Sequence, residues 1–379
     1  MDFSFIKFLP FIVFGLVFIF GGHYFIYRSL VSAFNISGFF KLGLAVFLFI
    51  LPLAFFASAF VAHFDQGWLS RVIYIISASW LGIAINLLLA AILIWLMNWL
   101  MNLAGLNFNR LVFGAVIFSA AIIFSAYGFW NAQHPQVKNI TIKIKNLPAA
   151  WQGKTIVQLA DIHLGRVHGE KFLQNIVDQT NAQNPDLILI TGDLFDGMDG
   201  GLDVFIEPLN NLRAKEGVFF VTGNHESYVG LDRALTALRQ TTIKILINEI
   251  IVVDGLQIVG LDYSLLSGEI GITGRSSDEE KIINSLPGWD RDKPSILMYH
   301  APINIGQAVA TGINFQLSGH SHNGQIWPFN FFTWLIYGQY DYGLNSLGDF
   351  TIYTTNGLGT WGPPMRTGNT PEIPVFKLK

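Results

Sequence analysis

Five short motifs rich in aspartate and histidine carry the chemistry that this sequence suggests. They are Asp161-Ile162-His163, Gly192-Asp193-Leu194-Phe195-Asp196, Gly223-Asn224-His225-Glu226, His300 within Met298-Tyr299-His300-Ala301-Pro302, and Gly319-His320-Ser321-His322. Residues at i and i+2 of an extended segment point the same way, so Asp161 with His163, and His320 with His322, can each place two side chains in one site. Imidazole and carboxylate ligands without thiols suit Zn, Mn or Fe ions that keep positions open for water.

Taken singly, each motif is weak evidence. A lone histidine at the end of a strand is more often a hydrogen-bonded surface or core residue than a metal ligand, and glycines are common in turns. The motifs gain weight together because each follows a predicted strand. Side chains just past the carboxyl ends of strands in an α/β sheet converge on one crevice.

Runs of aliphatic residues predict the strands that position these motifs. Leu187–Ile190 is continuous, as in a strand covered on both faces, and Gly192 permits a tight turn before Asp193. Asp193 is therefore a candidate for a carboxylate shared by two metal ions, and a solvated strand-end aspartate is the alternative. Further strands are predicted at 137–144, 155–160, 218–221, 250–253, 256–261, 296–299, 315–317, 350–354 and 375–378. Helices predicted at 172–181 and 203–213 give the β-α-β-α-β order of an α/β domain.

Two local signals refine this pattern. Asp254-Gly255 between two aliphatic runs predicts a two-residue hairpin. Ser277 followed by Glu280 predicts a capping box that starts a helix ending at Leu286.

The 379 residues fall into two regions of different composition, an apolar N-terminal region and a charged C-terminal region. The chain has 23 basic and 26 acidic residues, and five of the basic and two of the acidic residues precede Gln136. Residues 136–379 therefore contain 18 basic and 24 acidic residues. This acidic balance argues against a nucleic-acid partner, and bound divalent cations would offset part of it. The chain has no cysteine, so disulfides and thiolate metal sites are excluded.

Four apolar stretches precede residue 136. Phe8–Tyr27, Leu42–His63, Val72–Met101 and Leu111–Trp130 are each long enough to cross roughly 30 Å of hydrocarbon as a helix. The first lacks the basic start and small-residue cleavage site of a signal peptide, so we expect it to be retained. A multi-pass membrane domain over residues 1–135 is predicted, against the alternative of a soluble helical core. Asn86 and Asn98 within the third stretch are expected to pack against other helices rather than line a transport path.

Basic residues give a weak signal for orientation. Four spans place Lys7 and Arg71 on the side of the C-terminal domain and Arg28, Lys41 and Arg110 on the other side. Because basic residues favour the cytoplasm, this count favours an extracytoplasmic C-terminal domain. Three lysines just beyond the last span would reverse the count if they were included.

The five motifs together resemble those of the calcineurin-like metallophosphoesterases, whose pattern is D-x-H, G-D-x-x-D, G-N-H-[DE], H and G-H-x-H. The resemblance covers the chain from about Val137 to its end, with no motif missing. It implies a two-sheet α/β sandwich flanked by helices over residues 136–379, following the four-helix transmembrane bundle. It also implies two divalent metal ions and hydrolysis of a phosphoric ester or pyrophosphate.

Carried over to this sequence, the resemblance implies two overlapping sets of metal ligands. The first set would be Asp161, His163, Asp193 and His322, and the second set would be Asp193, Asn224, His300 and His320. Asp193 would bridge ions roughly 3.5–4 Å apart, which also lower the pKa of a water molecule between them. His225 would stabilise the transition state or protonate the leaving group. Asp196 and Glu226 are expected to support ligands rather than bind metal.

The amino-acid sequence of two C-terminal segments resembles that of the membrane-associated branch that includes YkuE- and YaeI-type phosphoesterases. The segments are Gly319–Gln325 and Asn356–Arg366, although Asn323 stands where glycine is common in that branch. This branch is associated with envelope lipids, including UDP-2,3-diacylglucosamine, so a lipid-linked substrate is expected. Arg366 follows a Gly/Pro-rich turn and is a candidate phosphate fork, with an ordinary surface arginine as the alternative.

An aromatic segment, residues 326–337, lies between these two motifs. Its sequence, IWPFNFFTWLIY, is unusually apolar for a position beside an active site. We interpret it as a lip that contacts the membrane or an acyl chain, and a core helix is the alternative.

These expectations favour a membrane-anchored, two-metal phosphoesterase acting at the bilayer surface. One alternative is a broad phosphodiesterase or phosphatase for a soluble or cell-wall substrate, with the helices as an anchor only. Another is an inactive metal-binding scaffold or sensor, which would be expected to lack a ligand or His225. Neither is missing here.

Overall fold

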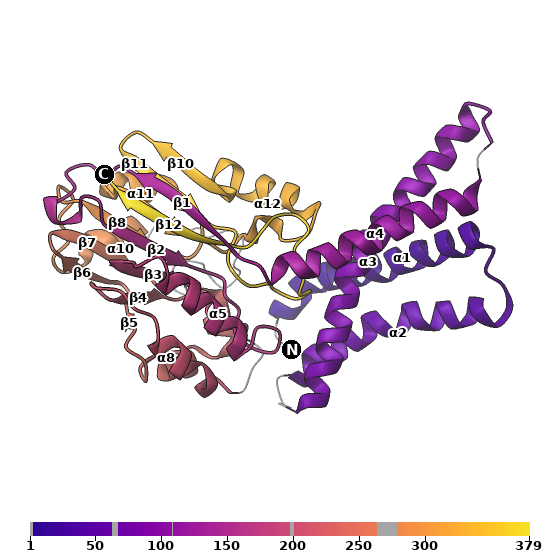
Figure 1. Cartoon of the computed structure of the whole chain (residues 1–379), viewed down its shortest axis with the longest axis horizontal. Helices are drawn as coiled ribbons and strands as arrows, with labels where there is room; N and C mark the ends of the chain where they lie inside the picture. The colour runs from indigo at the N-terminus through magenta and orange to yellow at the C-terminus, as the bar shows by residue number, and fades with distance from the viewer. Residues whose placement is uncertain (1–2, 63–66, 108, 198–200, 264–278) are drawn as a thin grey trace. The chain divides into compact units, whose positions relative to one another are not determined.

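The computed structural model describes residues 3–62, 67–107, 109–197, 201–263 and 279–379 (Figure 1). The chain forms two compact units. The helical unit comprises Met1–Trp130 with Gly362–Met365, and the α/β unit comprises Asn131–Trp361 with Arg366–Lys379.

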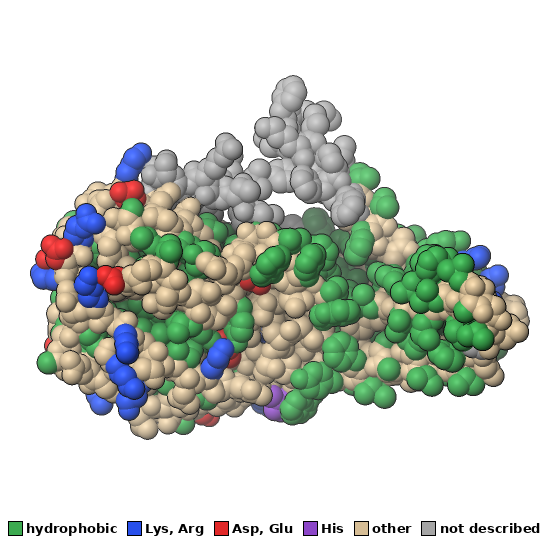
Figure 2. All heavy atoms as spheres, turned by 90° about the horizontal axis from the view of Figure 1, so that it is seen from above, with side chains coloured by type: hydrophobic (Ala, Val, Ile, Leu, Met, Phe, Trp, Pro, Cys, Tyr) green, Lys and Arg blue, Asp and Glu red, His purple; other side chains and the backbone are tan. Residues whose placement is uncertain are grey.

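Four long helices build the helical unit. They are α1 (Phe3–Phe34), α2 (Gly38–Ala62), α3 (Trp68–Leu103) and α4 (Arg110–Ala132). Each is long and apolar enough to cross a membrane, as the sequence predicts, although His63 lies outside the described residues. On the face shown in Figure 2, hydrophobic side chains predominate on these helices, whereas most charged side chains lie on the α/β unit.

The two asparagines of the third apolar stretch have different partners. Asn86 is buried, and its Nδ2 donates to Oγ of Ser125 on α4 at 2.9 Å. Asn98 instead donates to the carbonyl oxygen of Ile94 in its own helix at 2.8 Å. The packing role expected for Asn86 therefore joins α3 to α4, whereas the bond that the structure describes for Asn98 stays within α3.

Two six-stranded sheets form the centre of the α/β unit. The first contains, in spatial order, β1 (Gln136–Ile142), β12 (Glu372–Leu378), β2 (Thr155–Leu159), β3 (Leu187–Thr191), β4 (Val218–Val221) and β5 (Lys244–Ile245). The second contains β10 (Gly343–Leu347), β11 (Phe350–Thr354), β9 (Phe315–Ser318), β8 (Ser295–Met298), β7 (Leu256–Gly260) and β6 (Glu249–Val253). The run β2-β3-β4-β5 is parallel, and so is β7-β8-β9-β11.

Alternation along the strands produces the layers. In β3, Leu187 and Leu189 join the core between the sheets, whereas Ile188 and Ile190 join the core under the outer helices. This period of two is what a strand buried on both faces requires. The helices outside the first sheet are α5 (Glu170–Asn181), α6 (Ile206–Asn210) and α8 (Leu231–Leu238), and those outside the second are α10 (Glu279–Ser285) and α11 (Ile305–Thr311). The predicted helix–sheet–sheet–helix sandwich is confirmed (Figure 1).

Local predictions vary in accuracy. The Asp254-Gly255 hairpin joins β6 to β7, with both residues at positive φ as its turn type needs. The helix predicted at 203–213 is shorter and consists of a 3₁₀ turn at Asp203–Phe205 followed by α6. Ser277 of the predicted capping box lies outside the described residues, and the described helix begins at Glu279.

Several short elements were not predicted. They are β5, β10, α7 (Asn224–Val229), α8, α11 and 3₁₀ turns at Ala149–Trp151, His322–Gly324 and Gly338–Asp341. The helix α12 (Phe329–Tyr337) lies in the aromatic segment, for which a core helix is the alternative interpretation.

Candidate metal centre

All five motifs follow the carboxyl ends of parallel strands. Asp161 and His163 follow β2, Asp193 follows β3, and Asn224 follows β4 in the first sheet. His300 follows β8 and His320 follows β9 in the second sheet. The two sheets thus bring the predicted ligands together from both layers at one end of the sandwich.

Tight backbone turns aim these side chains inward. Residues at left-handed φ include five candidate ligands: Asp161, His163, Asp193, His320 and His322. Non-glycine residues rarely adopt this region, and they concentrate at functional sites where surrounding bonds hold them there. Neighbouring glycines make room, because a Cβ on Gly223 would clash with Oδ1 of Asp193, and one on Gly319 would clash with Oδ2 of Asp161.

One cluster contains Asp161, His163 and His322, whose ligand atoms lie within 4.8 Å of one another. The Nε2 atoms of His163 and His322 are 2.9 Å apart, and Nε2 of His322 is 3.6 Å from Oδ1 of Asp161. Two imidazole nitrogens at this distance need a proton or a cation between them. Oδ2 of Asp161 is buried and has no hydrogen-bond partner among the described residues. This donor set fits a divalent ion such as Mn, Zn or Fe.

A second cluster contains Asp193, His300 and His320, again within 4.8 Å. Nε2 of His300 lies 3.1 Å from Oδ2 of Asp193, 3.1 Å from Oδ1 of Asn224 and 3.2 Å from Nδ1 of His320. Oδ2 of Asp193 also lies 3.9 Å from Nε2 of His163 in the first cluster. The carboxylate of Asp193 therefore stands between the two clusters.

His225 lies beside both clusters. Its ring is 4.4 Å from that of His163 between centroids, and its backbone N–H donates to Oδ1 of Asp193 at 2.8 Å. Nδ1 lies 2.5 Å from the carbonyl oxygen of Asp196, which can only accept, so Nδ1 carries a proton. Nε2 is then the nitrogen that can exchange a proton with another molecule.

Glu226 holds the turn that carries Asp193. Its carboxylate accepts from the backbone N–H groups of Gly223, Asp193, Leu194 and Phe195 at 2.7–3.2 Å. These bonds leave Glu226 facing the backbone rather than the clusters. The carboxylate of Asp196 is 3.6 Å from Nδ1 of His163, so it lies behind that ring.

Burial and neighbouring charges shift the pKa values of the candidate ligands in different directions. Burial, reinforced by Asp193, raises the pKa of Asp161 to about 7. Burial lowers the pKa of His300, but the carboxylate of Asp193 outweighs it and raises that pKa to about 9. Burial and the neighbouring His300 lower the pKa of His320 to about 3, and burial with His163 lowers that of His322. His320 and His322 are therefore neutral at physiological pH, which is the form that binds metals.

Arg366 does not lie as the sequence suggested. It is 0% exposed, so it cannot form a phosphate fork open to the site. Its guanidinium donates to the carbonyl oxygens of Asn356 and Gly359 and to Oδ1 of Asn369. The Gly/Pro-rich turn before it is no sign of exposure, because the guanidinium turns to Asn356 and Gly359 in the preceding loop and to Asn369 just after it.

Two residues of this region escaped the sequence reasoning. Asn369 donates to the carbonyl oxygens of His322 and Asn323. The side-chain amide of Gln325 pairs with both the N–H and the carbonyl of Trp361. Neither asparagine nor glutamine has a distinctive local pattern, so only the fold shows what they bind.

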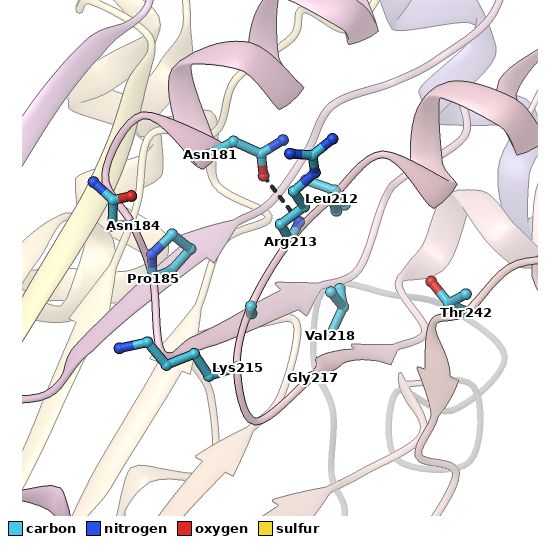
Figure 3. A pocket seen from close by; sticks show the side chains of 10 residues that line it. Asn181, Asn184, Pro185, Leu212, Arg213, Lys215, Gly217, Val218 and Thr242 are labelled. Carbon is cyan, nitrogen blue, oxygen red and sulfur yellow. Dashed lines mark hydrogen bonds between the residues drawn. The ribbon is translucent and has the colours of Figure 1, made fainter.

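A separate cavity lies at the other end of the first sheet. It has a volume of about 650 Å³ and opens near Pro185 and Gly217, which precede β3 and β4 (Figure 3). Asn181 on its wall accepts from the N–H of Arg213 at 2.9 Å. Its lining contains none of the candidate ligands, so we assign it no part in the metal centre.

Comparison with known proteins agrees with this geometry. The family model described as calcineurin-like phosphoesterase matches residues 154–324. A Campylobacter jejuni protein named "Uncharacterized metallophosphoesterase Cj0846" is 32% identical over 391 residues, covering 100% of this chain and 99% of its own. A Danio rerio "Transmembrane protein with metallophosphoesterase domain" is 30% identical, covering 88% of this chain and 79% of its own. Bacillus subtilis YkuE, also named a metallophosphoesterase, is 31% identical over 72% of this chain and 96% of its own. The chain belongs to the metallophosphoesterase family and is a metal-dependent phosphoester hydrolase with membrane-associated helices.

Proposed function

We propose that this protein cleaves a phosphodiester or pyrophosphate bond of a lipid-linked substrate at a membrane surface. The family supports the hydrolysis of a phosphate-containing substrate. One observation carries the lipid part of the proposal, which is the exposure of the apolar helix α12 beside the metal centre.

Two divalent ions would be held by the ligand sets already described. The first ion would be held by Asp161, His163 and His322, and the second ion by His300, His320 and Asn224. Both ions would share Asp193. When bound, such ions polarise the phosphoryl group and lower the pKa of a water molecule that serves as nucleophile. The protein contributes the placement of these ligands at two sheet ends.

His225 supplies proton transfer in this proposal. The carbonyl oxygen of Asp196 fixes the proton on Nδ1, so Nε2 is directed to donate a proton to the leaving oxygen or a hydrogen bond to a phosphoryl oxygen. The backbone N–H of His225 donates to Oδ1 of Asp193, which fixes the position of His225 relative to this shared ligand.

Helix α12 supports a substrate that carries acyl chains. None of its residues is buried, which contradicts the alternative of a core helix. Phe331, Phe332 and Trp334 are 57%, 53% and 54% exposed. The helix reaches the metal centre, because the ring of Tyr337 lies 6.1 Å from that of His320. Water contact over so much aromatic surface is costly, and lipid would relieve it.

The proposed location is a multi-pass membrane protein with an extracytoplasmic catalytic domain. Three residues separate α4 from β1, so the catalytic domain is tethered directly to the last apolar helix. The distribution of Lys7, Arg28, Lys41, Arg71 and Arg110 supports this orientation.

The test is a comparison of substrates with the purified full-length protein and Mn, Zn or Fe. UDP-2,3-diacylglucosamine in mixed micelles, UDP-glucosamine without acyl chains and an aryl phosphodiester would be offered side by side. We expect kcat/KM to be highest for the acylated substrate. Equal values with and without acyl chains would favour a soluble or cell-wall substrate. Metal binding without hydrolysis of any substrate would favour a scaffold.

A further inference from the structure

We propose that Asn369 and Arg366 are positioning residues that hold His322 for the first metal ion and affect the second metal ion much less. The inference rests on the proposed two-metal function. It assigns to the C-terminal segment of the chain a selective control over one half of the centre.

The turn that carries His322 needs outside support. His322 and Asn323 both adopt left-handed backbone conformations, with φ of 48° and 43°. Such residues persist when surrounding bonds over-determine them. Nδ2 of Asn369 supplies these bonds, because it donates to the carbonyl oxygen of His322 at 2.6 Å and to that of Asn323 at 3.0 Å.

Arg366 fixes Asn369 in turn. Its Nη1 donates to Oδ1 of Asn369 at 2.6 Å, so both ends of this amide are engaged. Asn131 donates to the carbonyl oxygens of both Arg366 and Asn369 at 3.0 and 2.7 Å, which fixes their backbone. Nη2 of Arg366 lies 3.2 Å from Nδ1 of His322, and Nε2 of the same ring faces Nε2 of His163 in the cluster.

The other partners of Arg366 brace a second ligand of the same cluster. The guanidinium binds the carbonyl oxygens of Asn356 and Gly359 at 2.9 and 3.0 Å. The N–H of Gly359 donates to the carbonyl oxygen of Asp161 at 2.7 Å. A single buried cation therefore links the turn of His322 to the loop that holds Asp161.

The second cluster has mainly different supports, apart from the backbone N–H of His320, which donates to Oδ1 of Asp161 at 2.9 Å. His300 is held by a bond from its Nδ1 to the carbonyl oxygen of Thr191 at 2.8 Å, and the turn of Asp193 is held by Glu226. The hydrogen bonds of Asn369 and Arg366 that the structure describes reach neither of these residues. A defect in the brace should therefore weaken the first metal site more than the second, whose His300 and Asp193 have their own supports.

The chemistry of Arg366 favours this role over substrate binding. A guanidinium is costly to bury, and here its described partners are backbone carbonyl oxygens, the amide oxygen of Asn369 and Nδ1 of His322. Its planar fork serves these separate partners at once, which the single ammonium of lysine cannot reproduce.

The experiment measures metal content and affinity in Asn369→Ala and Arg366→Lys proteins. Asn181→Ala is the matched control, because Asn181 also joins two backbone groups through its amide but lies at the far cavity. Elemental analysis gives the stoichiometry, and a Mn²⁺ titration followed by electron paramagnetic resonance gives the affinity of each site. Circular dichroism and thermal melting establish that each variant is folded.

We expect the wild type and Asn181→Ala to bind two ions per chain. Asn369→Ala and Arg366→Lys should bind the first ion about 10- to 100-fold more weakly, as loss of an outer support typically does, and retain the second. At saturating metal, kcat should recover and KM should stay near the wild-type value. Adding Asn369→Ala to His322→Ala should produce no further loss of the first ion.

Three outcomes would overturn the inference. Equal weakening of both metal sites would show a general loss of structure. Unchanged metal binding with a raised KM would return Arg366 to substrate binding. A further loss in the double variant would show that Asn369 does not act through His322. A wild type that binds fewer than two ions would instead refute the two-metal proposal itself. If Arg366→Lys does not fold, the result for Asn369→Ala decides, because that variant leaves the buried charge in place.

Discussion

Replacing Phe331, Phe332 and Trp334 together by serine removes most of the exposed aromatic surface of α12. An aromatic side chain buries about 150–250 Å² when fully covered, so half exposure leaves roughly 100 Å² on each of the three. At about 25 cal/mol per Å², lipid contact would contribute roughly 2.5 kcal/mol for each side chain. The membrane helices already hold the catalytic domain near the bilayer. We therefore expect only a fraction of this lipid-contact free energy to be lost from kcat/KM when the three side chains are removed.

A loss of about 1.4–2.8 kcal/mol corresponds to a fall of roughly 10- to 100-fold in kcat/KM for a lipid-linked substrate. Hydrolysis of a small water-soluble phosphodiester should be unchanged, because α12 supplies no candidate ligand. The assay compares both substrates with the full-length protein in lipid vesicles.

The matched control replaces Val204, Val252 and Leu347 by serine, since these apolar residues are also about half exposed but belong to other elements. This control should retain both activities. Should the α12 variant lose both activities equally, or unfold, the helix stabilises the fold and the lipid-contact proposal is wrong. An equal effect of the control on the lipid substrate would show that position on α12 is irrelevant.

Three other predictions test the centre and its location. Asp193→Asn removes the shared charge, so metal content and turnover should fall together in elemental analysis and hydrolysis assays, and retention of two ions with normal turnover would disprove the assignment. His225→Ala should lower turnover by roughly 10²- to 10⁴-fold with metal content nearly intact, and loss of bound metal would make His225 a ligand. Because the chain has no cysteine, Ser346→Cys and Ser37→Cys can each be labelled cleanly on intact cells. A membrane-impermeant maleimide should label Ser346→Cys and not Ser37→Cys, and the reverse pattern would place the catalytic domain in the cytoplasm.

The strands behind the motifs could be predicted because their signals are local. Leu187–Ile190 is apolar at every position since both of its faces are covered, and Gly192 marks the turn that follows. By contrast, β5 has two residues and β10 has polar and apolar positions on a sheet edge, so neither leaves a readable pattern.

The role of Arg366 could not be predicted, because it depends on contacts distant in sequence. Its side chain is satisfied by carbonyl oxygens of Asn356 and Gly359, and backbone carbonyls carry no mark in a sequence. Asn369 is equally invisible, since its acceptors are the carbonyl oxygens of His322 and Asn323. The exposure of α12 also needed the structure, because an apolar stretch of nine residues suits a core helix as well as an exposed one.

Only some of the residues that support the candidate ligands lie in the part of the chain that contains those ligands. The family model matches residues 154–324, and every candidate ligand from Asp161 to His322 lies within them. Arg366, Asn369 and the loop at Asn356–Gly359 lie beyond that match, yet they hold the turn of His322 and the backbone of Asp161. Supports for Asp193 and His300, such as Glu226 and Thr191, lie inside it. We therefore expect a change in the C-terminal segment to alter the first candidate metal site without touching a ligand, whereas Asp193 and His300 of the second depend on residues within the family match.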